Sequence, residues 1–246
     1  MNKPLIRARK PLVSRNRSEA TDQVLTFSPL AWLKLRLFLH AEEVEVGGFG
    51  ISSKEDLLYI DDFVSVKQNV TIVSVEFDDI AVADHFDRCA DTGIPPSRCG
   101  RIWIHTHPGS SPHPSFTDEK TFERVFGSCD WAVMAIVSRT GATYSRLRFS
   151  AGPGGETIIP LTVDWERYPK DLLDHEGEMD RRFIEWMDEY GTNIHHSPAL
   201  NLMPEIAQQP LTYSDQLDEL YDRQILTDDF SSFSEAFSAE EVYPWS

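Results

Sequence analysis

Apolar positions along the chain recur in two rhythms, and these predict its helices and strands. In residues 28–45 (SPLAWLKLRLFLHAEEVE), leucines at three-to-four spacing predict a helix with one buried face. Ser28 is its expected N-cap and Pro29 its first helical residue. The same spacing, with start and stop signals, predicts further helices at 78–93, 117–127, 170–191 and 213–230.

Between these helices lie short runs rich in β-branched and aromatic residues, which predict strands. The runs are 46–52, 57–66, 70–78, 100–107, 130–138, 143–150 and 156–165. Because strands and helices are mixed without a regular alternation, we expect an α+β fold with a mostly antiparallel sheet.

The character of the sequence changes after Trp165. We expect a basic arm at 1–24, one domain at 25–165, and an acidic helical extension with a tail at 166–246. From Asp164 onwards the chain has 20 Asp and Glu against 5 Lys and Arg, so this last third holds most of the net charge of −17. We expect the helices of the extension to pack on the domain.

Charge and composition argue against several classes of protein. The acidic balance disfavours a general nucleic-acid-binding surface, and no apolar run approaches the ~18 residues of a membrane span. The basic N-terminus lacks the apolar stretch of a secretory signal. Cys89, Cys99 and Cys129 are odd in number and lack CxxC spacing, which argues against disulfides and a cysteine-based zinc knuckle. We expect a cytoplasmic protein with reduced thiols that binds neither nucleic acid nor membrane.

The stretch 102–118, IWIHTHPGSSPHPSFTD, contains the candidate chemistry. Side chains two apart on a strand share a face, so His105 and His107 present two imidazoles side by side. Asp118 is the nearest carboxylate, in the first turn of a helix that we expect Thr117 to cap. Two imidazoles and a carboxylate suit a catalytic Zn²⁺ with its fourth position open to water.

The spacing H-x-H-x7-S-x2-D, from His105 through Ser115 to Asp118, resembles the signature of the JAMM metalloproteases, also called the MPN+ or JAB domain. The family also has a glutamate after its first helix, and EVGGF supplies Glu45. The resemblance covers about 25–165. It implies a mostly antiparallel, partly closed sheet flanked by helices, a cytidine-deaminase-like sandwich.

The resemblance also implies a mechanism. His105, His107 and Asp118 would hold one zinc ion, which lowers the pKa of its bound water towards ~7. Glu45 would take that water's proton and pass it to the leaving amine. Ser115 would donate a hydrogen bond to the oxyanion.

The implied substrate is a peptide or isopeptide bond after the C-terminus of ubiquitin or a ubiquitin-like protein. Only the short segment EKTFERVFGSCD leads from Asp118 into the next predicted strand, which favours a compact, bacterial-type enzyme. Activating and conjugating enzymes of the same pathway are possible partners. Two alternatives stay open: a non-catalytic MPN scaffold in a complex, and a metal-dependent hydrolase of a small molecule.

The remaining histidines are expected to stand outside the site. His113 lies in a proline-flanked turn that the family pattern does not require. His195 and His196 are adjacent, so on an extended chain they point apart, and we expect them in a linker. The others show no partner in the sequence: His40, His85 and His175.

Overall fold

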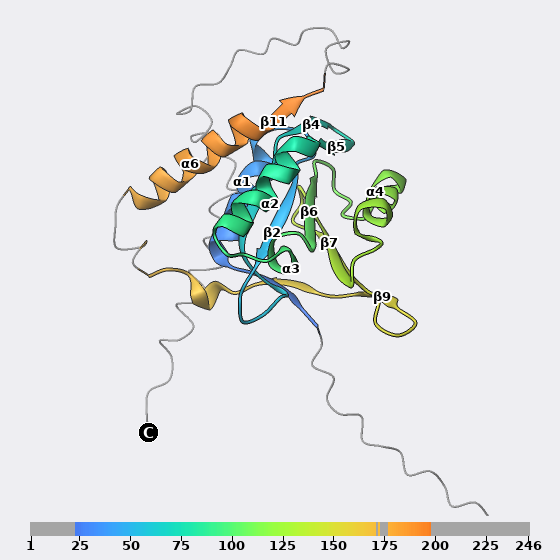
Figure 1. The fold of residues 1–246 in the computed structure, drawn as a ribbon. Helices are drawn as coiled ribbons and strands as arrows, with labels where there is room; N and C mark the ends of the chain where they lie inside the picture. The colour runs from blue at the N-terminus through green and yellow to red at the C-terminus, as the bar shows by residue number, and fades with distance from the viewer. Residues whose placement is uncertain (1–22, 171, 173–176, 198–246) are drawn as a thin grey trace, which may run out of the picture.

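In the computed structural model, residues 23–170, 172 and 177–197 are described, and they form one α+β unit (Figure 1). The helices are α1 (Pro29–Ala41), α2 (Asp79–Asp91), α3 (Pro96–Cys99), α4 (Phe116–Phe126), the 3₁₀ turn η1 (Trp165–Arg167) and α6 (Glu178–Asn193). The strands are β1 (Leu25–Phe27), β2 (Gly47–Ser52), β3 (Tyr59–Ser65), β4 (Gln68–Thr71), β5 (Ser74–Phe77), β6 (Ile102–His107), β7 (Trp131–Ser138), β8 (Thr143–Phe149), β9 (Gly155–Ile158), β10 (Leu161–Val163) and β11 (Ile194–His196).

Eight strands form a curled sheet in the order β10-β1-β3-β2-β6-β7-β8-β9. The pairs β2–β3, β2–β6, β7–β8 and β8–β9 are antiparallel, whereas β1–β3, β1–β10 and β6–β7 are parallel. The sheet is therefore mixed, and the α+β class is confirmed. β9 and β10 follow one another in the chain yet lie at opposite edges, and the Ile159 amide donates to the Ser145 carbonyl at 3.0 Å.

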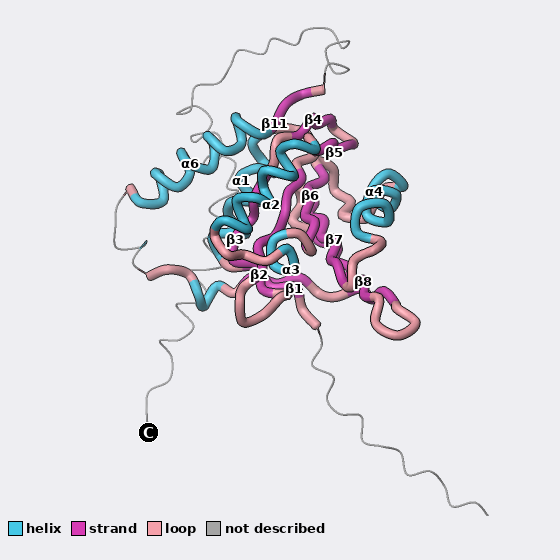
Figure 2. The backbone as a smooth tube through the Cα atoms, viewed as in Figure 1, coloured by secondary structure: helices cyan, strands magenta, loops and turns pink. Residues whose placement is uncertain are grey.

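The two faces of this sheet are covered by different helices (Figure 2). One apolar cluster joins α1 and α6 to Ile102 and Ile104 of β6. The other joins α4 and the start of α2 to Trp103, which points to the opposite face of the same strand. The central strands β2, β6 and β7 are thus buried on both sides, which explains the nearly continuous apolar sequence of β7.

Helix α1 begins as predicted, with the Ser28 hydroxyl accepting from the Ala31 amide at 3.2 Å and Pro29 as its first residue. Helix α1 is buried over more of its circumference than the single face that the leucine spacing predicts. Helix α6 covers a second side, where the Phe38 and Tyr190 rings lie 5.3 Å apart. On the same side Lys34 Nζ lies 2.6 Å from Glu189 Oε2.

Three predicted segments differ from the structure. Residues 70–78 do not form one strand. They contain the end of β4, a turn at Ile72 and Val73, and the antiparallel strand β5. The run 156–165 is divided between β9 and β10. The prediction of a linker around His195 and His196 is wrong, because both lie in β11, which pairs in parallel with β4.

Parts of the predicted organisation lie outside the described residues: most of the basic arm, His175, the helix at 213–230 and the acidic tail. The domain boundaries stay predictions. Within the ranges that the structure describes, no helix combines the length and apolar character needed to cross a membrane.

Candidate metal centre

Strand β6 carries two of the three predicted ligands. His105 pairs with Gly47 of β2 on one side and Ile136 of β7 on the other, and His107 ends the strand. Thr106 points to the opposite face, where its hydroxyl accepts from the Val46 amide at 2.9 Å. The two imidazoles therefore share one face, with ring centroids 5.2 Å apart.

Asp118 is held in place by a capping box. The Ser115 hydroxyl accepts from the Asp118 amide at 3.2 Å, and the Ser115 amide donates to Asp118 Oδ2 at 2.6 Å. Ser115 is thus the N-cap of α4, and the prediction that Thr117 caps this helix is wrong. The reciprocal pair requires a carboxylate three residues after the cap, and only Ser115 stands at that distance from Asp118.

The three side chains meet at one point. Nε2 of His105 lies 3.3 Å from Asp118 Oδ1, and Nε2 of His107 lies 3.6 Å from Asp118 Oδ2. The ligand atoms of this group all lie within 4.8 Å of one another, so a single metal ion could contact all three. The Asp118 carboxylate lies near both rings, of which His105 is buried and His107 is partly exposed.

The unused hydrogen-bonding capacity here fits a metal ion. Nε2 of both histidines is buried and makes no hydrogen bond. His107 Nδ1 donates to the Ser111 carbonyl at 2.9 Å, which fixes its tautomer and leaves the Nε2 lone pair directed at the group. Buried polar atoms without partners are rare, and a bound cation would satisfy these.

Electrostatics favour the metal-binding charge state at His105 and Asp118. At His107, in contrast, burial is outweighed, because hydrogen bonds to Asp118 and Ser111 and the charge of Glu45 raise the pKa of the imidazole. Burial lowers the pKa of His105 despite the nearby Asp118 carboxylate, so this ring is neutral. Burial opposes ionisation of Asp118, but the two histidines and Ser115 hold its pKa well below its usual range. A neutral imidazole beside a carboxylate is the form in which both bind zinc.

Glu45 reaches the group from the segment between α1 and β2. Its amide donates to the Thr71 carbonyl at 2.9 Å, and its Oε1 lies 3.8 Å from His107 Nε2. Burial raises the pKa of Glu45 to about 7, with His107 opposing and Asp118 adding to the rise. A carboxyl group near neutrality is suited to accept and return protons.

The glycines after Glu45 have a packing reason. A Cβ on Gly48 would stand 2.4 Å from the Val64 carbonyl oxygen, so no larger residue fits between β2 and β3. The buried Gln68 amide bonds the Gly47 amide and carbonyl, each at 2.8 Å, and so ties β4 to the start of β2. These contacts bring the Glu45 backbone close to the end of β6.

Ser115 and His113 lie at the rim. Ser115 is exposed, and because its oxygen accepts from the helix amide, its own proton can be donated outwards. His113 is exposed in the loop, with its ring 6.0 Å from that of Tyr144. It is not a member of the ligand group.

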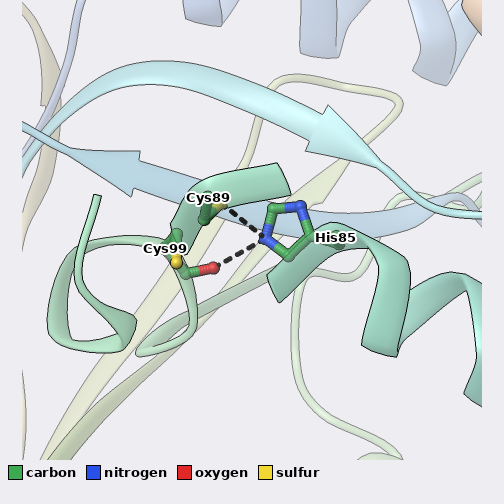
Figure 3. Close-up of side chains that lie close together, drawn as sticks. All are labelled: His85, Cys89 and Cys99. Atoms are coloured by element: carbon green, nitrogen blue, oxygen red, sulfur yellow. Dashed lines mark hydrogen bonds between the residues drawn. The ribbon is translucent and has the colours of Figure 1, made fainter. Parts of the chain in front are cut away.

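A second group of metal-ligand type lies on α2 and α3: His85, Cys89 and Cys99, all buried (Figure 3). The sequence indicates no partner for His85 and predicts one metal ion per chain. The described residues contain two groups of metal-ligand type. The spacing H-x3-C places His85 and Cys89 one helical turn apart, and this signal could have been used.

No protein-family model matches the chain, and no curated protein is significantly similar to it.

Proposed function

We propose that the protein is a zinc-dependent isopeptidase or peptidase of the JAMM type, acting after the C-terminus of ubiquitin or a ubiquitin-like protein. One observation carries the proposal: Glu45, His105, His107, Ser115 and Asp118, drawn from three separate elements, converge on one spot. These are the residues of the H-x-H-x7-S-x2-D motif together with the upstream glutamate.

In this proposal His105, His107 and Asp118 hold the metal through two nitrogens and a carboxylate oxygen. When bound there, zinc would activate a water molecule and polarise the scissile carbonyl. Glu45, whose carboxylate lies 3.8 Å from His107 Nε2, would accept the proton of the attacking water and return it to the leaving amine. Ser115, with its exposed hydroxyl, donates a hydrogen bond to the developing oxyanion.

The ligand set supports hydrolysis over a scaffold role, because a scaffold does not require orphaned imidazole nitrogens beside a glutamate of raised pKa. The compact path from α4 to β7 leaves the rim of the site free of a large insertion. This fits a small enzyme whose substrate is a flexible, extended C-terminal tail. Activating and conjugating enzymes of the same modifier would be its pathway partners.

The test is cleavage of a linear ubiquitin fusion, and of ubiquitin-like fusions, by zinc-loaded protein and its Glu45→Gln variant. We expect the variant to lose about 10²–10⁴-fold in turnover, the range of a lost general base, while its metal content stays unchanged. Glu43→Gln is the matched control, since this exposed glutamate lies two residues earlier and faces Arg139. It should cleave like the wild type.

Turnover that survives in Glu45→Gln would refute the assignment of the base. A wild-type protein that binds zinc and cleaves no modifier would favour the small-molecule hydrolase, and one that binds no metal at the histidines would favour the scaffold.

A further inference from the structure

The end of α2 and the short helix α3 bring together a second set of ligand atoms. His85 and Cys89 face the same way from successive turns of α2. Cys99, the last residue of α3, approaches them because the Ile94 amide bonds the Cys89 carbonyl at 2.8 Å and the chain then turns at Pro95 and Pro96. Figure 3 shows one nitrogen of the His85 ring directed at the Cys89 sulfur and at the carbonyl oxygen of Cys99.

We propose that His85, Cys89 and Cys99 form a three-ligand zinc site, separate from the centre on β6, with the Cys99 carbonyl oxygen, 2.9 Å from His85 Nε2, available for the fourth position. Cys89 Sγ lies 3.8 Å from His85 Nε2, and the three ligand atoms lie within 4.8 Å of one another. Tetrahedral zinc, with bonds of about 2.3 Å to sulfur and 2.0–2.1 Å to nitrogen, separates these atoms by roughly 3.6 Å. Little movement is needed to admit the ion.

The surroundings determine which ion fits. The two cysteines pack in an apolar cluster with Ile51, Val64 and Ile94, so an uncompensated charge would be costly there. Two thiolates, one neutral imidazole and one Zn²⁺ sum to zero charge. Binding releases one proton from each thiol, and the remaining imidazole proton moves from Nε2 to Nδ1. Thiolate sulfur selects zinc over magnesium and calcium.

A metal at this site would stabilise the packing of α2 and α3 against β2. The Phe49 ring of β2 stacks on the His85 ring at 4.9 Å and 9°, and Arg98 Nε of α3 donates to the Ser52 carbonyl at 2.8 Å. The His85 imidazole also donates to the Cys99 carbonyl at 2.9 Å, a bond that metal binding would replace. A metal joining α2 to α3 would therefore hold both helices against the strand that leads from Glu45.

Cobalt substitution tests this site apart from the proposed activity, because sulfur occurs in only one of the two described ligand groups. The full chain, freed of metal and loaded with Co²⁺, should show a thiolate-to-cobalt charge-transfer band in the near ultraviolet. Cys89→Ser/Cys99→Ser should lose the band and one of two bound ions. Cys129→Ser, which changes the cysteine outside the group, should keep both.

A second measurement does not depend on the variants folding. In the zinc-loaded wild-type protein, native mass spectrometry should count two zinc ions per chain, and a single ion would overturn the second site. Absence of the charge-transfer band in the wild type, or its persistence in the double variant, would overturn the proposal. So would an intact mass that shows Cys89 and Cys99 joined in a disulfide.

Discussion

Each of the two ligand groups contains histidine, but the groups differ in their other ligands and in the side chains that surround them. The β6 group offers nitrogen and oxygen, lies beside Glu45, and has the exposed Ser115 at its rim. The α2–α3 group offers sulfur and nitrogen and is enclosed by apolar side chains, with no carboxylate among its members. A metal site with a proton acceptor beside it and access for a substrate can support a reaction, whereas a metal enclosed by apolar side chains can only stabilise the fold. The chemistry of the surroundings, more than the ligands themselves, separates a catalytic from a structural role.

The groups are nevertheless joined by packing. Phe49 of β2 stacks on His85 and pairs across the sheet with Trp103 of β6. Trp103 in turn stacks on His105, with ring centroids 4.4 Å apart. Since Phe49 and Trp103 belong to the same apolar cluster, packed side chains connect one group to the other.

The largest effect that separates the two groups is expected for His107→Ala, measured beside Cys99→Ser. Loss of a residue that only supports a metal ligand typically costs about 10–100-fold in affinity or activity. Loss of the ligand His107 should therefore cost more than ~100-fold in fusion cleavage, with little change in the melting temperature.

Cys99→Ser should show the reverse order of effects. A hydroxyl placed in this apolar cluster costs about 1–3 kcal/mol in the free energy of unfolding. The melting temperature should therefore fall clearly, whereas turnover should change little. If Cys99→Ser abolished cleavage while its melting temperature held, the division into a catalytic and a structural group would be wrong.

Short-range signals were enough to predict most of the β6 group. The two-residue period of β6 placed His105 and His107 on one face, and the helix start after Ser115 brought Asp118 near them. The choice of Thr117 as cap failed because hydroxyl type alone cannot decide between neighbouring candidates. The reciprocal bond to Asp118 decides it, and this depends on side-chain geometry.

Long-range placement could not be read from the same signals. The hairpin turn at Ile72 and Val73 consists of apolar residues that the pattern counted as strand, although both are exposed. The approach of Cys99 to His85 depends on how α3 folds back, which neither spacing nor composition reveals. The pairing of β11 with β4 likewise joins segments more than a hundred residues apart.

A comparable effect on stability is expected for Phe49→Ala. This buried ring contacts His85, Phe77 and Phe86, and its removal should cost about 3 kcal/mol in the free energy of unfolding. Chemical denaturation measures this, with the partly exposed Phe149 as the control, whose replacement by Ala should cost well under half as much. Equal losses would show that the packing around Phe49 has no special part in joining the groups.

The smallest effect is expected for Gly48→Ala, which adds one methyl group at the strand between the two sites. That carbon would lie 2.4 Å from the Val64 carbonyl and 2.6 Å from the Phe63 ring, so β2 and β3 must separate locally. Overpacking of this kind costs about 1–3 kcal/mol. Gly109→Ala is the matched control, because nothing lies within 4 Å of its added carbon.

Since Gly48 also pairs with Ile104, the residue before His105, the shift should lower metal affinity at β6 more than at the cysteines. Titration of both sites with Co²⁺ would measure the two affinities, and an unchanged affinity at β6 would show that Glu45 and His105 are positioned without help from the tight contact at Gly48.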